Sequence, residues 1–429
     1  MKEKLIEKIK NHSAIIGIIG LGYVGIPLML RFSEVGYRVI GFDIDESKIE
    51  KINSGLSYIK HFSDQQIKIA IRNGFLATKD FERVNNVDII ILCLPTPLSK
   101  TREPDLSYIF DSLDLIKDHI RDGQLISLES TTYPGTTNEV ISPILKQRGF
   151  SIGKDFFLVY SPEREDPGNL NYNTKTTPKV LGGFTSDCCD VGESLYSEVI
   201  EKVVRVSSTQ CAEMTKLLEN IYRSVNIGLV NEMKVIADKM EIDIHEVISA
   251  ASTKPFGFTP FYPGPGLGGH CIPIDPFYLS WKAKEFGLET KFIELAGSIN
   301  INMPSWVVNK LIDGLNEVSK SIKGSKVLIL GAAYKKNIDD LRESPSLALM
   351  KLLKDKSAVI SYHDPYISHI KEFNLTSIDL EYENIDSYDA VLISTDHDCF
   401  DYKKILKFAR LIIDTRGIYK ENHVNVVKA

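Results

Sequence analysis

The chain has 429 residues, of which 43% are apolar and 25% are charged, and its formal net charge is −6 at pH 7. That length is too great for one ordinary hydrophobic core, so we expect two or three domains. The acidic balance supports no broad basic face and argues against nucleic-acid binding. The N-terminal segment lacks a signal-peptide core and no apolar run reaches the length of a membrane span, so we expect a cytoplasmic protein without membrane insertion.

The first 43 residues have the order of a dinucleotide-binding βαβ unit. An apolar run at 14–19 ends in a glycine turn, a helical pattern follows at 26–35, and a short strand at 37–42 leads to Asp43. In such units the pyrophosphate lies at the helix N-terminus and the acid bonds the ribose, which disfavours the 2′-phosphate of NADP. We therefore predict NAD as cofactor. The turn residues are Gly20, Gly22, Tyr23, Val24 and Gly25.

Three further apolar runs, at 87–94, 124–128 and 157–160, are separated by helical stretches. Runs that are apolar throughout predict a parallel sheet covered on both faces. Ligands bind outside the carboxyl ends of such strands, where Thr96 and residues 129–131 and 161–168 fall.

The middle of the chain is predicted to be helical. About thirty residues, from 209 to 240, have apolar positions at helical spacing and no proline, and a second helix is expected at 244–251. Lys216 and Asn220, four residues apart, share one helix face. Spacing alone favours a solvated lysine and an ordinary surface asparagine.

A glycine loop at 262–275 has four glycines in six residues and leads to Cys271, with Asp275 four residues further on. Glycines let backbone N–H groups approach an anion, and a thiolate is a good nucleophile. The alternative is a surface turn followed by a small buried cysteine. The six cysteines, at 93, 188, 189, 211, 271 and 399, have no metal-ligand spacing, so we predict reduced thiols and no metal site.

The last third begins again with strand-like runs, at 325–331, 358–364, 390–395 and 411–414. Gly331 stands without the full glycine pattern, so this region is a poorer dinucleotide site and a candidate for a different nucleotide. The predicted fold is α/β, with two Rossmann-like doubly wound domains joined by a helical central region that contains one long helix. The predicted boundaries are 1–205, 206–310 and 311–429.

Together these motifs resemble the nucleotide-sugar 6-dehydrogenases, the family that includes UDP-glucose and GDP-mannose dehydrogenases. The segments that carry the resemblance are 20–25, 129–131, 161–163, 216–220, 264–275 and 331–345. Segments 161–168, 254–260 and 269–278 look most similar to the UDP-N-acetylglucosamine 6-dehydrogenases of bacterial surface-polysaccharide pathways. UDP-glucose enzymes usually carry Gly-Gly-Ser-Cys-Phe and Asn-Pro-Glu-Phe-Leu there, and this chain departs from both.

The resemblance implies NAD in the N-terminal domain, UDP against the C-terminal domain, and a homodimer or higher homo-oligomer with contacts through the helical middle. It implies four-electron oxidation of UDP-N-acetyl-D-glucosamine at C6 to UDP-N-acetyl-D-glucosaminuronate, for O-antigen or capsule precursors. UDP-glucose, UDP-N-acetylgalactosamine, UDP-N-acetylmannosamine and GDP-mannose stay open as substrates. More distant alternatives are a two-electron 3-hydroxy-acid dehydrogenase and an NAD-sensing regulatory protein.

The catalytic roles also follow from the resemblance. Cys271 is the expected nucleophile, forming a thiohemiacetal and then a thioester. Lys216 and Asn220 would stabilise the oxyanion. We favour Glu163 for thioester hydrolysis, with water held by Thr131, and Asp275 as support for Lys216; which carboxylate does which stays open. His270 is expected to be a loop residue, and the other cysteines to be packing residues.

The remaining expectations concern binding. Lys48 would contact the ribose, Thr96 and Thr131 the nicotinamide side, and Arg342 would reach the cofactor. The loop containing Gly264, Gly266 and Gly268 would cradle the substrate pyrophosphate. Further substrate contacts are expected from Glu163, Arg164, Lys216, Asn220, Lys335 and Arg416. Phe256, Phe258, Phe261 and Tyr262 would either wall the uracil or acetamido group or pack under the loop.

Overall fold

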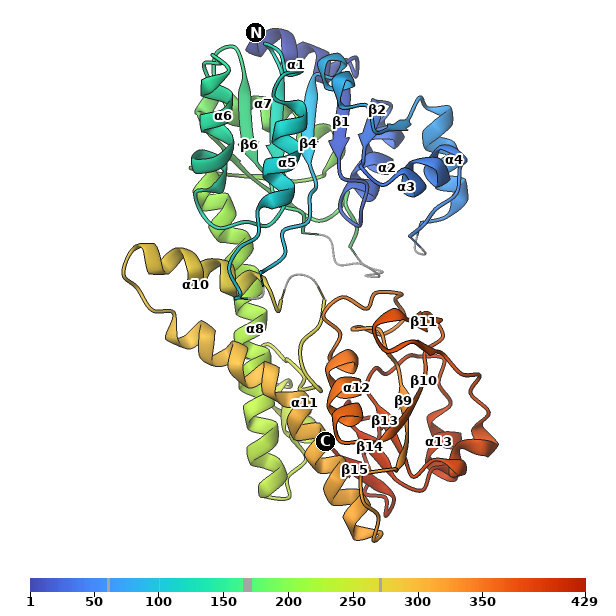
Figure 1. The fold of residues 1–429 in the computed structure, drawn as a ribbon. Helices are drawn as coiled ribbons and strands as arrows, with labels where there is room; N and C mark the ends of the chain where they lie inside the picture. The colour runs from blue at the N-terminus through green and yellow to red at the C-terminus, as the bar shows by residue number, and fades with distance from the viewer. Residues whose placement is uncertain (60–61, 100, 165–171, 270–271) are drawn as a thin grey trace. The chain divides into compact units, whose positions relative to one another are not determined.

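The computed structural model describes residues 1–59, 62–99, 101–164, 172–269 and 272–429 (Figure 1). The chain divides into two compact units. The first comprises residues 1–219 and 277–288, and the second comprises residues 220–276 and 289–429. The helical middle is thus shared between the units, and the three predicted ranges stay a prediction.

The first unit is built on one large sheet, which within the described residues has eight strands in the order β3-β2-β1-β4-β5-β6-β7-β8. The strands are β1 (Ile15–Ile19), β2 (Arg38–Phe42), β3 (Leu76–Thr78), β4 (Ile89–Leu92), β5 (Leu125–Leu128), β6 (Phe157–Tyr160), β7 (Lys179–Gly183) and β8 (Val203–Val206). Neighbours are parallel except β6 and β7, which are antiparallel. Every residue of β4, β5 and β6 is buried, which confirms the prediction of a sheet covered on both faces.

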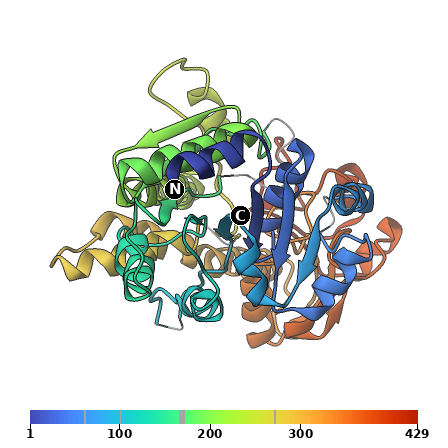
Figure 2. The same ribbon diagram turned by 90° about the horizontal axis from the view of Figure 1, so that it is seen from above.

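Helices flank this sheet. They are α1 (Lys2–Lys10), α2 (Gly25–Val35), α3 (Glu46–Asn53), α4 (Asp64–Arg72), α5 (Ser107–Ile116), α6 (Ser142–Gln147) and α7 (Ser186–Val199), with the short turns η1 (Phe81–Asn86) and η2 (Thr137–Ile141). Seen from above, dark-blue α1 lies alongside green α7 (Figure 2), and Lys2 of α1 bonds Asp187 and Asp190 of α7. The β1–β4 neighbourhood, where strand order reverses, is where such sheets bind ligands.

The second unit contains a smaller sheet, parallel throughout, in the order β10-β9-β13-β14-β15. Its strands are β9 (Lys326–Leu330), β10 (Val359–His363), β13 (Ala390–Ile393), β14 (Ile412–Asp414) and β15 (Val426–Lys428). Val327 and Ile329 pack in one core with α11 and α12, whereas Leu328 and Leu330 pack in the other core with α13. Because successive side chains of β9 point to opposite faces, this strand contributes apolar side chains to the cores on both faces of the sheet.

The helices of the second unit are α9 (Ile244–Ala251), α11 (Lys291–Glu317), α12 (Pro345–Asp355) and α13 (Tyr402–Phe408). A small hairpin, β11 (His369–Ile370) with β12 (Leu375–Thr376), and the turns η3 (Lys371–Phe373) and η4 (Tyr382–Ser387) complete it. The predicted long helix is α8 (Thr209–Lys239), and the division between units falls within it and within α10 (Asp275–Glu285). Across the described ranges no helix is both long and apolar enough to cross a membrane.

Candidate active site

The glycine turn after β1 is closely packed at two glycines and open at the third. Gly20 has φ +95°, and a Cβ there would lie 2.3 Å from the Cys93 carbonyl oxygen; a Cβ at Gly25 would lie 1.9 Å from the Gly20 oxygen. Gly22 has nothing within 4 Å of such an atom. Two glycines thus permit the turn, and the third leaves room for a ligand at the N-terminus of α2, as a dinucleotide pyrophosphate requires.

Tyr23 and Val24, also predicted in this turn, are partly buried against the core of the sheet. Val24 caps α2, and within the described part of the chain no side chain bonds this helix end and no acidic residue lies in its first turn. The positive end of the helix dipole is therefore available to an anion.

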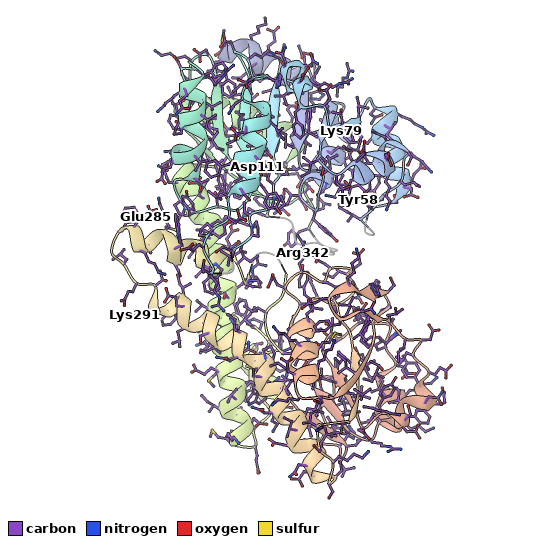
Figure 3. The ribbon with its side chains drawn as sticks, in the orientation of Figure 1. Tyr58, Lys79, Asp111, Glu285, Lys291 and Arg342 are labelled. Carbon is purple, nitrogen blue, oxygen red and sulfur yellow. The ribbon has the colours of Figure 1, made fainter. Side chains whose placement is uncertain are left out.

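Asp43 and Lys48 lie together beyond β2, as predicted. Asp43 is 8% exposed; its Oδ2 accepts from Leu21 N at 2.9 Å and lies 3.6 Å from Lys48 Nζ. No sequence pattern indicates a third neighbour, Tyr58 (Figure 3), whose hydroxyl donates to the Leu21 oxygen at 2.5 Å. Burial, and then the charge of Asp43, raise the pKa of Tyr58, so it stays a neutral donor.

Two predicted threonines follow neighbouring strands of the first sheet. Thr96 follows β4 and is buried, and Thr131 follows β5 and is half-buried. The two strand ends are tied together, because Leu94 N donates to Ser130 Oγ at 2.9 Å. The polar ends of β4 and β5 therefore lie side by side, as parallel pairing predicts.

The loop after β6 is bound to the first part of α8. Lys216 Nζ donates to the Glu163 carbonyl oxygen at 2.7 Å, and Glu163 Oε1 accepts from Arg164 N at 2.7 Å. The Arg164 guanidinium pairs with Glu219 at 2.5 Å. Lys216 is only 7% exposed, so the solvated-lysine alternative is wrong.

Within the second unit, α8 and the start of α10 share a buried polar pair. The Asn220 amide donates to Asp275 Oδ2, and Arg223 donates to Asn220 Oδ1. Asn220 and Asp275 are 0% and 2% exposed, so the surface-asparagine alternative is wrong as well. His270, Cys271 and residues 165–168 lie outside the described residues.

The glycine loop is held by an asparagine network. Gly264 N donates to Asn231 Oδ1 at 3.0 Å, and Asn231 in turn donates to Asn300 Oδ1 at 2.9 Å. A Cβ at Gly264 would lie 2.9 Å from Arg416 Nη1, and one at Gly268 would lie 2.5 Å from Tyr334 Cβ. The loop therefore has a guanidinium against its backbone, an arrangement suited to an anion. Burial lowers the pKa of Arg416, but a guanidinium keeps its charge.

The other predicted binding residues of the second unit are more exposed. Gly266 has φ +140°, and Lys335 is half-buried. Arg342 is exposed and its guanidinium pairs with Asp340 at 2.6 Å (Figure 3). Phe256, Phe258 and Tyr262 are 71%, 39% and 56% exposed, so packing under the loop is wrong for these three, while Phe261 is half-buried with its ring 5.6 Å from Tyr222.

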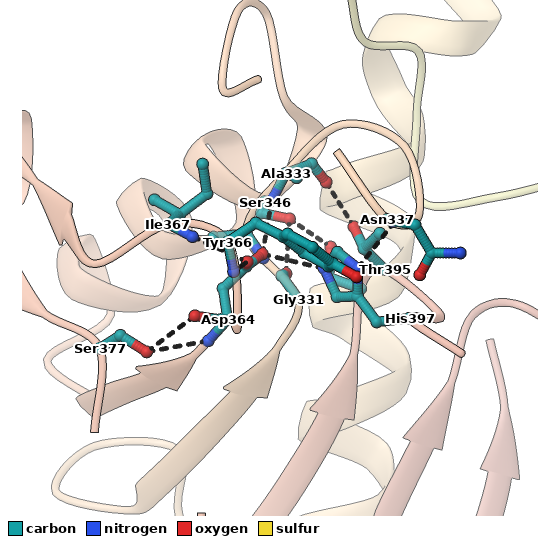
Figure 4. Close-up of polar contacts among 12 residues, drawn as sticks. Gly331, Ala333, Asn337, Ser346, Asp364, Tyr366, Ile367, Ser377, Thr395 and His397 are labelled. Atoms are coloured by element: carbon teal, nitrogen blue, oxygen red, sulfur yellow. Dashed lines mark hydrogen bonds and ion pairs between the residues drawn. The ribbon is translucent and has the colours of Figure 1, made fainter. Parts of the chain in front are cut away.

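The second sheet has its own acid in the position that follows the second strand of a βαβ unit, Asp364 after β10 (Figure 4). Its Oδ2 accepts from Ala332 N at 2.6 Å, Ala333 N at 3.0 Å and His397 Nε2 at 3.0 Å. Its Oδ1 accepts from the N–H groups of Tyr366 and Ile367. Burial would raise the pKa of Asp364, but these bonds outweigh it and hold the pKa low.

His397 is fully buried, and its Nδ1 accepts from Asn337 N at 3.0 Å, which leaves the proton on Nε2 for Asp364. With five donors on its two oxygens, Asp364 has no capacity left for a ribose, whereas Asp43 accepts from two backbone N–H groups, those of Leu21 and Asp45. This agrees with the prediction that the second domain is a poorer dinucleotide site.

The remaining cysteines differ in environment. Cys93, Cys188 and Cys189 are buried in the core, as expected, but Cys211 and Cys399 are exposed, so the packing expectation is wrong for those two. Among the described residues no group of three or more His, Cys, Asp or Glu side chains could hold a metal ion.

Three family models match in sequence. They are the NAD binding, central and UDP binding domains of the UDP-glucose/GDP-mannose dehydrogenase family, at residues 14–200, 210–302 and 328–421. The chain belongs to this family. It is thus an NAD-dependent nucleotide-sugar dehydrogenase, and the predicted family, fold class and cofactor are confirmed.

Individual relatives cover nearly the whole chain. A UDP-N-acetyl-D-mannosamine dehydrogenase of Pyrococcus horikoshii is 34% identical, over 96% of this chain and 97% of its own. A UDP-N-acetyl-D-glucosamine 6-dehydrogenase of Pseudomonas aeruginosa is 30% identical, over 95% and 97%. The solved structure of the Pyrococcus horikoshii UDP-D-ManNAc dehydrogenase aligns with TM-score 0.88 at 31% identity, over 96% and 98%.

Proposed function

We propose that this family member oxidises C6 of UDP-N-acetyl-D-glucosamine to the carboxylate of UDP-N-acetyl-D-glucosaminuronate, in the cytoplasm, for bacterial surface-polysaccharide precursors. Two NAD and one water are consumed per sugar. The segments at 161–168, 254–260 and 269–278 and the Pseudomonas aeruginosa relative support this sugar.

The observation that carries the chemistry is the buried Asn220–Asp275 bond. The two side chains are almost fully excluded from solvent, and Asp275 lies four residues beyond Cys271 in sequence. Burying an amide and a carboxyl costs free energy that packing alone does not require, and such groups gather at functional sites.

In this proposal the Cys271 thiolate adds to the C6 aldehyde left by the first oxidation. The thiohemiacetal is oxidised to a thioester, and water hydrolyses the thioester and releases the thiol. Lys216 and Asn220 stabilise the oxyanions. Glu163 activates the water, which Thr131 helps to hold, and the 2.7 Å bond that links Lys216 to the Glu163 backbone supports their acting in one site.

The proposed binding roles are those that the family resemblance implies. NAD, which accepts the hydride when bound, is held by the turn after β1 and the residues around it. These are Gly20, Gly22, Tyr23, Val24, Gly25, Asp43, Lys48, Thr96, Thr131 and Arg342. The UDP-sugar is held by Glu163, Arg164, Phe258, Tyr262, Gly264, Gly266, Gly268, Lys335 and Arg416. The open side of Gly22 and the guanidinium beside Gly264 support the two assignments.

UDP-N-acetyl-D-mannosamine is the second candidate substrate, because the Pyrococcus horikoshii relative named for it shares 34% identity with this chain. Both sugars present the same primary alcohol, so the chemistry above serves either.

We also propose a homodimer through the helical middle. In the second unit, Leu229, Met233, Ile236 and Met240 are 54%, 41%, 48% and 62% exposed. Their spacing places the first three in one stripe along the end of α8, and Met240 directly follows the helix. An apolar stripe of this kind is typical of a protein–protein contact. Sedimentation of wild type and Ile236→Glu tests this, with loss of the dimer in the variant as the expected result.

The sugar is tested with a panel of nucleotide sugars, measuring NADH formed per sugar consumed. We expect the highest kcat/KM with UDP-N-acetyl-D-glucosamine and two NADH per sugar. A higher value with UDP-N-acetyl-D-mannosamine would change the assigned sugar, and one NADH per molecule of a 3-hydroxy acid would overturn the four-electron reaction.

A further inference from the structure

A buried ionic cluster lies in the first unit where β5 ends and β7 begins. Glu129, Lys179 and Tyr196 are 1%, 4% and 0% exposed. Lys179 Nζ lies 2.6 Å from Glu129 Oε2, and the Tyr196 hydroxyl donates to the other oxygen of Glu129. The ammonium also lies 5.1 Å from the centre of the Tyr196 ring. Burying such charges is costly unless they are paired in this way.

The same ammonium reaches the loop that carries Glu163. Lys179 Nζ lies 3.6 Å from Glu163 Oε2 and donates to the Pro162 carbonyl at 3.5 Å. The backbone joins the two acids as well, because Glu163 N donates to the Glu129 carbonyl at 3.4 Å. One cation therefore contacts both carboxylates and the backbone between them.

The charges in this cluster do not balance when all groups are ionised, since two carboxylates face one ammonium. Burial, opposed by Lys179 and reinforced by the charge of Glu163, raises the pKa of Glu129 to about 7. Burial works against the charged form of Lys179, but the two acids outweigh it and raise its pKa. Near neutral pH the lysine is thus charged, while Glu129 holds a proton for part of the time.

We propose that Lys179 is a positioning residue for Glu163: its ammonium fixes the Glu163 carboxylate, and buried Glu129 is its counter-ion. The inference rests on the proposed function, in which Glu163 acts on the hydrolytic water. Stability alone is a poor reason for this cluster, because well-packed apolar side chains often replace a buried ion pair without loss. The contact with Glu163 is what an apolar pair could not supply.

The decisive variant is Glu129→Gln/Lys179→Met, which removes both buried charges together. Lys179→Met alone leaves Glu129 without its cation, a change that destabilises folded proteins. Lys179→Arg is the matched control, because it keeps a cation at this position. The readouts are melting temperature, KM for NAD, and kcat for NADH formation.

We expect the double variant to melt within a few degrees of wild type, with unchanged KM for NAD and kcat lowered about tenfold. Without the ammonium the Glu163 carboxylate loses its fixed position, so the loss falls on kcat and not on NAD binding, a split that a general loss of structure would not produce. Lys179→Arg keeps the wild-type kcat. A double variant with the wild-type kcat, or a Lys179→Arg protein with the kcat of the double variant, would overturn the inference.

A second measurement separates this inference from the proposed function. In crystal structures of the wild type and the double variant, the Glu163 carboxylate should keep its place in the wild type and be displaced in the variant. This readout needs no turnover. If no nucleotide sugar is oxidised but the carboxylate is displaced, the proposed function fails and the positioning role stands; if the sugar is oxidised but the carboxylate does not move, the reverse holds.

Discussion

The Asn220 side chain donates a hydrogen bond to Asp275, and neither residue has appreciable contact with solvent. Asp275 opens α10, and Asn220 lies within α8, so the bond joins two helices of the second unit at the end of the glycine loop. The carboxylate thereby fixes which way the amide points, and Arg223 reinforces this by donating to the amide oxygen.

Asp275→Asn should therefore lower kcat strongly with little change of shape. An amide cannot offer Asn220 the same pair of acceptor oxygens, so the Asn220 N–H loses its fixed direction. We expect kcat for NADH formation to fall about a hundredfold, as for loss of one oxyanion donor. Asp313→Asn, at an exposed position on α11, is the control and should retain wild-type kcat. Equal kcat for the two variants would remove Asp275 from the site.

Cys271→Ser should abolish formation of the sugar acid, because a hydroxyl does not replace a thiolate as nucleophile toward the aldehyde. The dissociation constant of NAD, measured by fluorescence titration, should stay within about twofold of wild type, since the NAD residues belong mainly to the first unit. Cys399→Ser, at an exposed cysteine, should behave as wild type. Substantial uronate from the Cys271→Ser protein would disprove the thioester route.

The glycine turn predicts opposite outcomes for two similar substitutions. Gly22→Ala places a methyl group in open space, so the melting temperature should hold while the NAD dissociation constant rises about tenfold. Gly25→Ala places its methyl 1.9 Å from a backbone oxygen and should destabilise the protein by about 2–3 kcal/mol. Calorimetry and NAD titration on both variants check this; weaker NAD binding without loss of stability in Gly25→Ala would contradict it.

Glu213 makes the stability of the folded protein depend on pH over a defined pH range. It is fully buried, and its carboxylate accepts from Gly135 N at 2.6 Å and from Thr137 N at 2.9 Å. Burial, only partly offset by these bonds, raises its pKa from 4.5 to about 7. The folded state thus holds a proton that the unfolded state releases, so this group's stabilisation is complete below pH 4.5 and is lost as pH rises to about 7.

Glu213→Gln should accordingly flatten the dependence of melting temperature on pH across that window, although the lost acceptor lowers the melting temperature throughout. Glu82→Gln, at an exposed glutamate of the same unit, is the matched control and should keep the wild-type slope. A Glu213→Gln protein with the wild-type slope would show that another group is responsible.

Strands whose residues are apolar throughout are the ones that the sequence predicted most directly. β4, β5 and β6 are fully buried and fall where the apolar runs placed them. β7 escaped prediction because it opens with Lys179 and ends in two glycines, and its burial depends on the ion pair with Glu129. The long helix α11 escaped because Pro304 lies inside it.

The residues of the candidate site also fall into those that the sequence could predict and those that it could not. Glycine turns and strand-end acids carry their own signals, so Gly22 and Asp43 could be named from the sequence, and Asp275 from its place four residues after Cys271. Tyr58 and Lys179 could not, because each owes its place to residues distant in the chain: Tyr58 to Leu21, and Lys179 to Glu129 and Glu163. A side chain that is held in a site only by residues distant in the chain has no recognisable pattern in the sequence around it.

The contrast between Asp43 and Asp364 shows how one architecture serves two ligands in a single polypeptide. Both acids follow the second strand of a βαβ unit, yet Asp43 accepts from two backbone N–H groups and Asp364 from four backbone N–H groups and a histidine. His397 lies far along the sequence and supplies the fifth of these hydrogen bonds. The acid of the repeated half is thus saturated from within while the architecture of the two halves stays alike, and His397 is the residue at which to begin redesigning that half.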